Sequence, residues 1–168
     1  MSTENKKTSR IDLYVDHLLD CKDMDNLILK GHLMTEWALQ YYINEFAKKK
    51  VNFKKVRFTY SNKLEIAKLL GLFENGNTKL YRLLKLINGL RNSIAHNVEY
   101  DSKILKKFFE ECYIQSIKGE NDIEIMNPDD KIEYKLSKTE KTTINGNHFR
   151  LLLNVSMMCS KIYKISGL

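Results

Sequence analysis

Apolar residues recur every three or four positions along most of this chain, as in helices that bury one face. From Leu27 to Phe46 they cover most of the circumference, so we expect the central helix of a bundle there, capped by Asp25 or Asn26 and ending near Ala47. Its polar side chains recur every fourth position and form one narrow stripe: His32, Glu36, Gln40 and Asn44.

The same periodicity predicts helices over residues 11–19, 61–70, 78–94 and 102–112, and from 147 onward. Their predicted caps are Ser61, Thr78, either Asp101 or Ser102, and Asn147. The fold class that follows is all-α, an antiparallel bundle of five to six helices. Residues 1–9 are predicted to be a flexible arm and residues 10–168 a single helical domain.

The pattern changes between residues 118 and 145. Ile123 and Ile125, and then Ile132, Tyr134 and Leu136, alternate with polar residues. Between these two runs, the segment 127–130 (Asn-Pro-Asp-Asp) is a strong turn signal. Between residues 120 and 145 the sequence therefore allows either a small β-hairpin or an ordered loop.

Composition and charge narrow the function classes. The chain has 168 residues and only one Pro, which favours long helices over a turn-rich sandwich. Its net charge of +7 favours an anionic partner such as nucleic acid. A Lys-rich surface that is simply solvated explains the charge equally well. The sequence lacks an apolar run of about 18 residues, a secretory signal and any CxxC pair, so we expect a cytoplasmic protein without a membrane span, disulfide framework or zinc knuckle.

The segment from Arg91 to His96, which closes the fourth helix, carries the candidate chemistry. Arginine stabilises anionic oxygens and histidine transfers protons near neutral pH. Together they could cleave RNA by acid–base transesterification: His96 moves the proton of the 2′-hydroxyl or of the leaving 5′-oxygen, while Arg91 stabilises the phosphorane. Asn92 could hold the imidazole or a phosphate oxygen. This chemistry needs no metal and no cofactor.

A helical wheel separates these residues. Arg91 falls within the apolar stripe, whereas Asn92 and His96 share a face about 140° away. A single straight helix would hold such a site poorly. The residues could meet if the helix ended near His96, or if two chains paired so that both copies of Arg91 and His96 lined one cleft.

A structural role explains the same residues. A buried Arg91 must be paired, and Glu36 on the otherwise apolar central helix is the expected partner. His96 would then cap a helix C-terminus, where its cation is favoured. His32 and Glu36 have metal-ligand spacing, but no third ligand is identifiable, so we predict no metal site.

The basic segment after the central helix is a tentative RNA-binding surface. Its cations include Lys54, Lys55 and Arg57, interleaved with Phe53 and Phe58. Such a pattern can follow a phosphate backbone, but it is equally typical of a solvated loop whose aromatic side chains enter the core.

The spacing from Arg91 to His96 resembles the Arg-x4–6-His motif of HEPN domains (higher eukaryotes and prokaryotes nucleotide-binding), with Asn92 at the polar position that commonly follows the arginine. Residues 30–36 and 60–72 are similar to the mannitol-operon repressor-like branch, and the likeness covers about residues 24–98. The resemblance implies an all-α bundle that forms a homodimer with the two motifs facing each other.

Many HEPN proteins are metal-independent endoribonucleases of toxin–antitoxin or phage-defence systems, so the resemblance implies an RNA substrate and an antitoxin protein as a further partner. Other HEPN domains are noncatalytic regulatory or interaction modules, and this alternative stays open. A DNA-binding repressor ranks last, because no helix-turn-helix with a basic recognition helix is evident.

Overall fold

The computed structural model describes residues 18, 21, 23–48, 51–113, 117–118, 124–125, 131–135 and 141–167. The side chains of Lys54 and of residues 117–144 are outside this description. The predicted flexible arm and all of the helix predicted at 11–19 except Leu18 lie outside the described residues.

Five helices of ten or more residues build the described part, together with the single turn α3, and the prediction of an all-α fold is confirmed. The helices are α2 (Met24–Phe46), α3 (Phe53–Val56), α4 (Tyr60–Leu69), α5 (Thr78–Asn97), α6 (Ser102–Glu111) and α7 (Gly146–Ile165). None of the helices in the described ranges is both long enough and apolar enough to cross a membrane.

Side-chain caps set where most of these helices begin. Asp23 accepts the backbone N–H of Asn26 at 2.7 Å, so α2 starts before the predicted caps Asp25 and Asn26. Thr59, and not Ser61, caps α4 and forms a reciprocal capping box with Asn62. At the other starts, the caps are Asn77 for α5, Asp101 for α6 and Asn145 for α7. At α2, α4 and α7 the cap side chain accepts the backbone N–H of the residue three positions ahead. Asp101 accepts the N–H groups of both Lys103 and Ile104, and Asn77 makes no side-chain cap bond.

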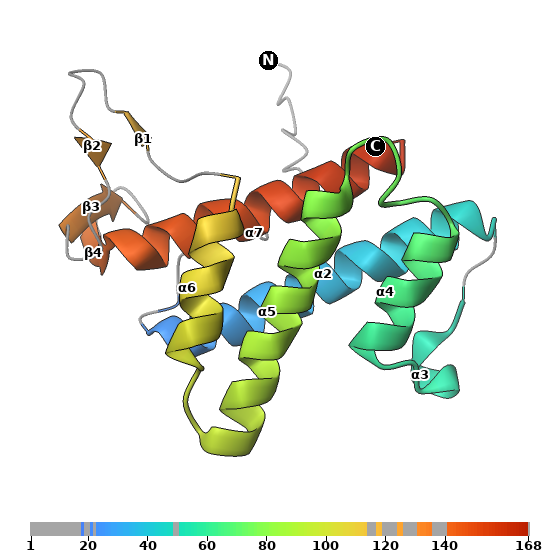
Figure 1. Cartoon of the computed structure of the whole chain (residues 1–168), viewed down its shortest axis with the longest axis horizontal. Helices are drawn as coiled ribbons and strands as arrows, with labels where there is room; N and C mark the ends of the chain where they lie inside the picture. Colours follow the sequence, from blue (N-terminus) through green and yellow to red (C-terminus); the bar gives the residue numbers. More distant parts are fainter. Residues whose placement is uncertain are drawn as a thin grey trace, which may run out of the picture.

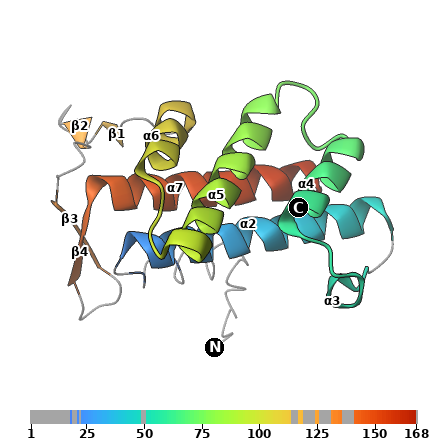
Figure 2. The same cartoon turned by 60° about the horizontal axis from the view of Figure 1, so that its bottom comes forward.

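Helix α2 is central, as predicted, because it packs against α7, α4 and α5. Helix α2 runs parallel to α7. Gly31 lies opposite Val155, and further along both helices the ring centres of Tyr41 and Tyr163 are 5.3 Å apart, so residue numbers increase in the same direction on the two helices. Figures 1 and 2 show this pair as a long layer with α4, α5 and α6 lying across it.

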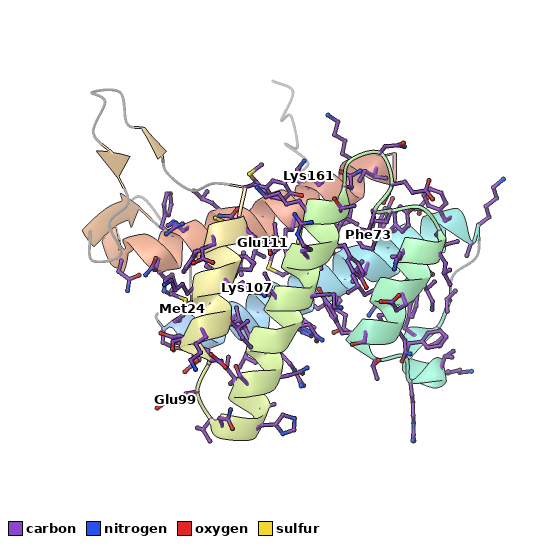
Figure 3. The ribbon with its side chains drawn as sticks, viewed as in Figure 1. Met24, Phe73, Glu99, Lys107, Glu111 and Lys161 are labelled. Atoms are coloured by element: carbon purple, nitrogen blue, oxygen red, sulfur yellow. The ribbon has the colours of Figure 1, made fainter. Side chains whose placement is uncertain are left out.

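The predicted antiparallel order holds between α5 and α6. Arg82 Nε donates to Glu111 Oε2 at 2.6 Å near one end of the pair, and the backbone N–H of Asp101 donates to Ser93 Oγ at 2.9 Å near the other. Figure 3 labels Glu111 on α6 beside α5, and Glu99 in the loop that joins the two helices.

The backbone between α6 and α7 forms two short antiparallel pairs. Strand β1 (Ile117–Lys118) pairs with β2 (Glu124–Ile125), and β3 (Lys131–Lys135) pairs with β4 (Lys141–Asn145) in the register Ile132 to Ile144. Of the two alternatives for residues 120–145, the backbone therefore takes the hairpin. Its partner strand is residues 141–145 and not the segment before the predicted turn.

Candidate active-site cleft

A cleft of about 460 Å³ lies among three helices. Figure 1 shows two of them, α4 and α5, side by side in front of the third, α2. Three elements line it: α2, the start of α4 and the C-terminal half of α5. Its lining is mainly polar and consists of His32, Glu36, Thr59, Tyr60, Ser61, Asn88, Arg91 and Asn92. The cleft thus brings together three of the four predicted site residues, namely Glu36, Arg91 and Asn92, but not His96.

His32 is held from three sides. Its Nε2 lies 3.1 Å from Asn88 Oδ1, and its ring stacks on the ring of Tyr60 at 4.3 Å. Thr35 Oγ1 donates to the His32 carbonyl at 2.8 Å and lies 3.1 Å from the Tyr60 hydroxyl. His32 as a residue is 8% exposed, and these contacts fix the orientation of its imidazole at the base of the cleft.

Burial is the main influence on the His32 imidazole and lowers its pKa below the ordinary value. The hydrogen bond to Asn88 and the charge of Glu36 oppose this effect, whereas the cations Arg91 and Lys63 add to it. The side chain is therefore neutral at neutral pH, with a lone pair free to accept a proton.

Glu36 pairs with Lys63, whose Nζ donates to Glu36 Oε1. The Lys63 residue is 4% exposed and its ammonium lies 5.5 Å from the centre of the Phe53 ring. We call His32, Glu36, Tyr60 and Lys63 the cleft floor. The core ion pair between Arg91 and Glu36, on which the structural alternative rested, is not formed, because the buried Lys63 on α4 pairs with this carboxylate instead.

Arg91 is exposed, contrary to the prediction that it lies in the core. Its angular position was predicted correctly, but the buried residues of α5 end at Leu90. Beyond that point no residue of α5 is buried, so the face that packs inward earlier in the helix opens into the cleft at Arg91. There Arg91 Nη1 donates to Asn92 Oδ1 at 3.3 Å. We call Arg91 and Asn92 the cleft rim.

His96 lies in the last turn of α5, is exposed and does not line the cleft. The helix continues through Asn97 and ends where Val98 adopts a left-handed conformation at φ 68°. His96 is thus five residues beyond Arg91 in a regular helix, about 140° around the axis and about 7.5 Å along it. The loop marked by Glu99 in Figure 3 follows directly. The helix thus ends near His96, as the first of the two alternatives supposed, but His96 itself still lies within regular helix.

The tentative RNA-binding cations lie beside the cleft along the chain. Lys55 and Arg57 are exposed, and Arg57, at φ 50°, ends α3 two residues before Thr59. Lys54 belongs to the same turn, although its side chain is outside the description. Phe53 is buried and Phe58 half-buried, with ring centres 6.2 Å apart, so the aromatic side chains of this segment face inward.

Asn88 and the start of α4 were missed by sequence reasoning. A signal was present, since Asn88 stands three residues before Arg91 and interrupts an apolar face with an amide. Across the described ranges, no three His, Cys, Asp or Glu side chains gather in a way that could hold a metal ion, so His32 and Glu36 have no third such neighbour there.

No family model, no curated protein and no solved structure matches this chain.

Proposed function

We propose that this chain is a HEPN-type, metal-independent endoribonuclease that works as a homodimer and acts as a toxin or phage-defence effector. The observation that carries the proposal is the state of Arg91. Arg91 lines a polar cleft together with the amide of Asn92 and the imidazole of His32. Within the described residues no carboxylate pairs with Arg91, because Glu36 pairs with Lys63. A guanidinium in that state suits an anionic ligand.

The reaction is an in-line transesterification. The 2′-oxygen of RNA attacks the adjacent phosphorus and the bond to the 5′-oxygen breaks, leaving a 2′,3′-cyclic phosphate and a 5′-hydroxyl. Arg91 stabilises the extra charge on the phosphorane, and Asn92, which accepts from Arg91, orients the guanidinium or a phosphate oxygen. His96 transfers one of the two protons that the step requires.

A second copy of the chain is needed to bring His96 to an Arg91 cleft. Within one chain the two side chains leave the helix about 140° apart. Apolar side chains beside the cleft support the pairing: Leu29, Leu33 and Trp37 are 38–43% exposed and follow one another at one-turn intervals on α2, next to His32 and Glu36. A twofold contact over this surface would place one rim opposite the other.

The charge of the molecule also supports RNA as the partner. The net charge is +7, and Lys55 and Arg57 present exposed cations just before the segment that forms one wall of the cleft. An RNA strand entering the cleft could therefore release counterions along this segment.

One observation favours the alternative of a noncatalytic HEPN regulatory or interaction module: His96 stands outside the cleft of its own chain. The cleft would then bind an anionic ligand without cleaving it.

The deciding experiment is RNA cleavage by purified protein in EDTA, with analysis of the product ends. The ribonuclease should leave cyclic phosphates, and Arg91→Ala and His96→Ala should each lose cleavage while Lys107→Ala, an exposed cation on α6, keeps it. Intact RNA with the wild-type protein, or full cleavage by His96→Ala, would refute the proposal.

Light scattering of the wild type and of Leu33→Glu tests the dimer. The charge of the introduced glutamate should dissociate the two chains.

A further inference from the structure

The proposed reaction requires two proton transfers, one from the attacking 2′-hydroxyl and one to the leaving 5′-oxygen. His96 can supply one of them. The other group should lie in the cleft near Arg91, because it must reach the same phosphodiester. That group must also be able to move a proton near neutral pH.

Most of the lining is unsuited to this task. Arginine side chains are not proton donors or acceptors near neutral pH, Glu36 is engaged by Lys63, and burial raises the pKa of the Tyr60 hydroxyl well above its ordinary range. Thr59, Ser61, Asn88 and Asn92 do not titrate near pH 7. His32 is the remaining lining group that can exchange a proton there.

The geometry around His32 prepares it for this role. A hydrogen bond with Asn88 Oδ1 requires Nε2 to donate, so Nδ1 carries the lone pair. Asn88 and Arg91 are one turn apart on α5, so the helix that presents the guanidinium also presents the amide that holds the imidazole. The stacking on Tyr60 fixes the plane of the ring.

We infer that His32 is a second catalytic residue of this chain, the general base that takes the proton from the attacking 2′-hydroxyl; the inference rests on the proposed function. The proton passes to His32 Nδ1 as the bond from the 2′-oxygen to phosphorus forms. His96, contributed by the partner copy, gives its proton to the 5′-oxygen as the bond from phosphorus to that oxygen breaks. One proton is taken up and one released, so the step balances.

Charged and titratable groups from each neighbouring element surround this base. Glu36 comes from α2, Tyr60 and Lys63 from α4 and Arg91 from α5, while Cys159 of α7 lies near Tyr60. Burial with the cations Arg91 and Lys63 outweighs Glu36 and the Asn88 hydrogen bond, so the pKa of His32 is lowered. The acidic limb of the pH–rate profile should accordingly have its midpoint below pH 6.5.

The test compares His32→Gln and His96→Ala on two substrates in EDTA: an ordinary RNA dinucleotide and its analogue with sulfur in place of the 5′-oxygen. Sulfur leaves without a proton, so the analogue bypasses the general acid and not the general base. We expect His32→Gln to slow cleavage by roughly 10²- to 10⁴-fold on both substrates and to lose the acidic limb. His96→Ala should be slow on the ordinary substrate alone.

The outcomes separate the two proposals. A wild type that cuts neither substrate overturns the proposed function and this inference with it. Cleavage by the wild type together with unchanged cleavage by His32→Gln, or rescue of His32→Gln by the sulfur analogue, overturns the role of His32 alone. Binding of a 2′-deoxy dinucleotide and a thermal melt check that His32→Gln is folded. If this variant does not fold, the wild-type profile decides, and an acidic limb centred above pH 6.5 overturns the inference.

Discussion

The cleft floor and the cleft rim each carry one cation, and the two cations are held differently. Lys63 on the floor is 4% exposed, pairs with Glu36 and lies over the Phe53 ring. Arg91 on the rim is exposed and donates to the neighbouring amide of Asn92. The floor therefore fixes the shape of the cleft, and the rim is left available to a ligand. Substitutions in the Glu36–Lys63 pair of the floor should act on stability, and those on the rim on activity.

The largest effect is expected on the floor. Glu36→Ala leaves the Lys63 ammonium buried without a counter-charge, which should lower the free energy of unfolding by about 3 kcal/mol. Urea denaturation measures this loss. The double variant Glu36→Leu/Lys63→Met removes both charges and should recover most of it. A Glu36→Ala protein as stable as the wild type would show that the floor pair has no structural role.

The next effect tests the rim. Arg91→Ala should reduce RNA cleavage by roughly 10²- to 10³-fold, because one donor to the phosphorane is lost. Its free energy of unfolding should stay within about 0.5 kcal/mol of the wild type, because the side chain is exposed. Single-turnover cleavage and urea denaturation give the two numbers. A large loss of stability would contradict the distinction between floor and rim.

A smaller effect comes from pH. Because the pKa of His32 is lowered by burial, the unfolded chain takes up the proton first as the pH falls below 6.5. Stability should therefore fall as the pH drops from 6.5 through the lowered pKa, and His32→Gln should remove part of this loss. Urea midpoints at about pH 7.5 and about pH 5.5 measure it. His148, whose pKa is also lowered by burial, remains in that variant, so His148→Gln is the matched comparison.

The smallest effect concerns the cations beside the cleft. Lys55→Ala and Arg57→Ala should each lower the slope of log affinity against log salt by about 1 for a non-cleavable RNA, with cleavage chemistry unchanged at saturation. Fluorescence anisotropy over a salt series measures the slopes. Lys103→Ala, an exposed cation on α6, is the control. Equal slopes for all three variants would assign Lys55 and Arg57 to ordinary solvated surface.

The helices could be predicted because periodicity records which positions face the core, and the angular position of Arg91 was predicted correctly for the same reason. Its exposure could not be predicted, since burial depends on where the covering helices end, and on α5 burial stops at Leu90. The partner of Glu36 was also beyond the sequence, because Lys63 and Arg91 are both suitable cations and their distances from Glu36 depend on tertiary packing.

The directions of the helices and the pairing of the strands could likewise be predicted only in part. Short loops force neighbouring helices to run antiparallel, as α5 and α6 do, but more than thirty residues separate α6 from α7 and permit either direction. The parallel arrangement of α2 and α7 is therefore a tertiary outcome. The hairpin of β3 and β4 was foreseen as an alternative, while its pairing partner was not.

The close approach of Gly31 to Val155 bears on the order in which the protein is assembled. A Cβ on Gly31 would lie 3.0 Å from Val155 Cγ2, so α2 and α7 are seated directly against each other although residues 47–145 lie between them in the chain. During synthesis α2 emerges well before α7, the helix that covers this side of it. We expect His32 and Glu36, carried on α2, to reach their final positions only after α7 has been made, which would delay formation of the cleft until that point.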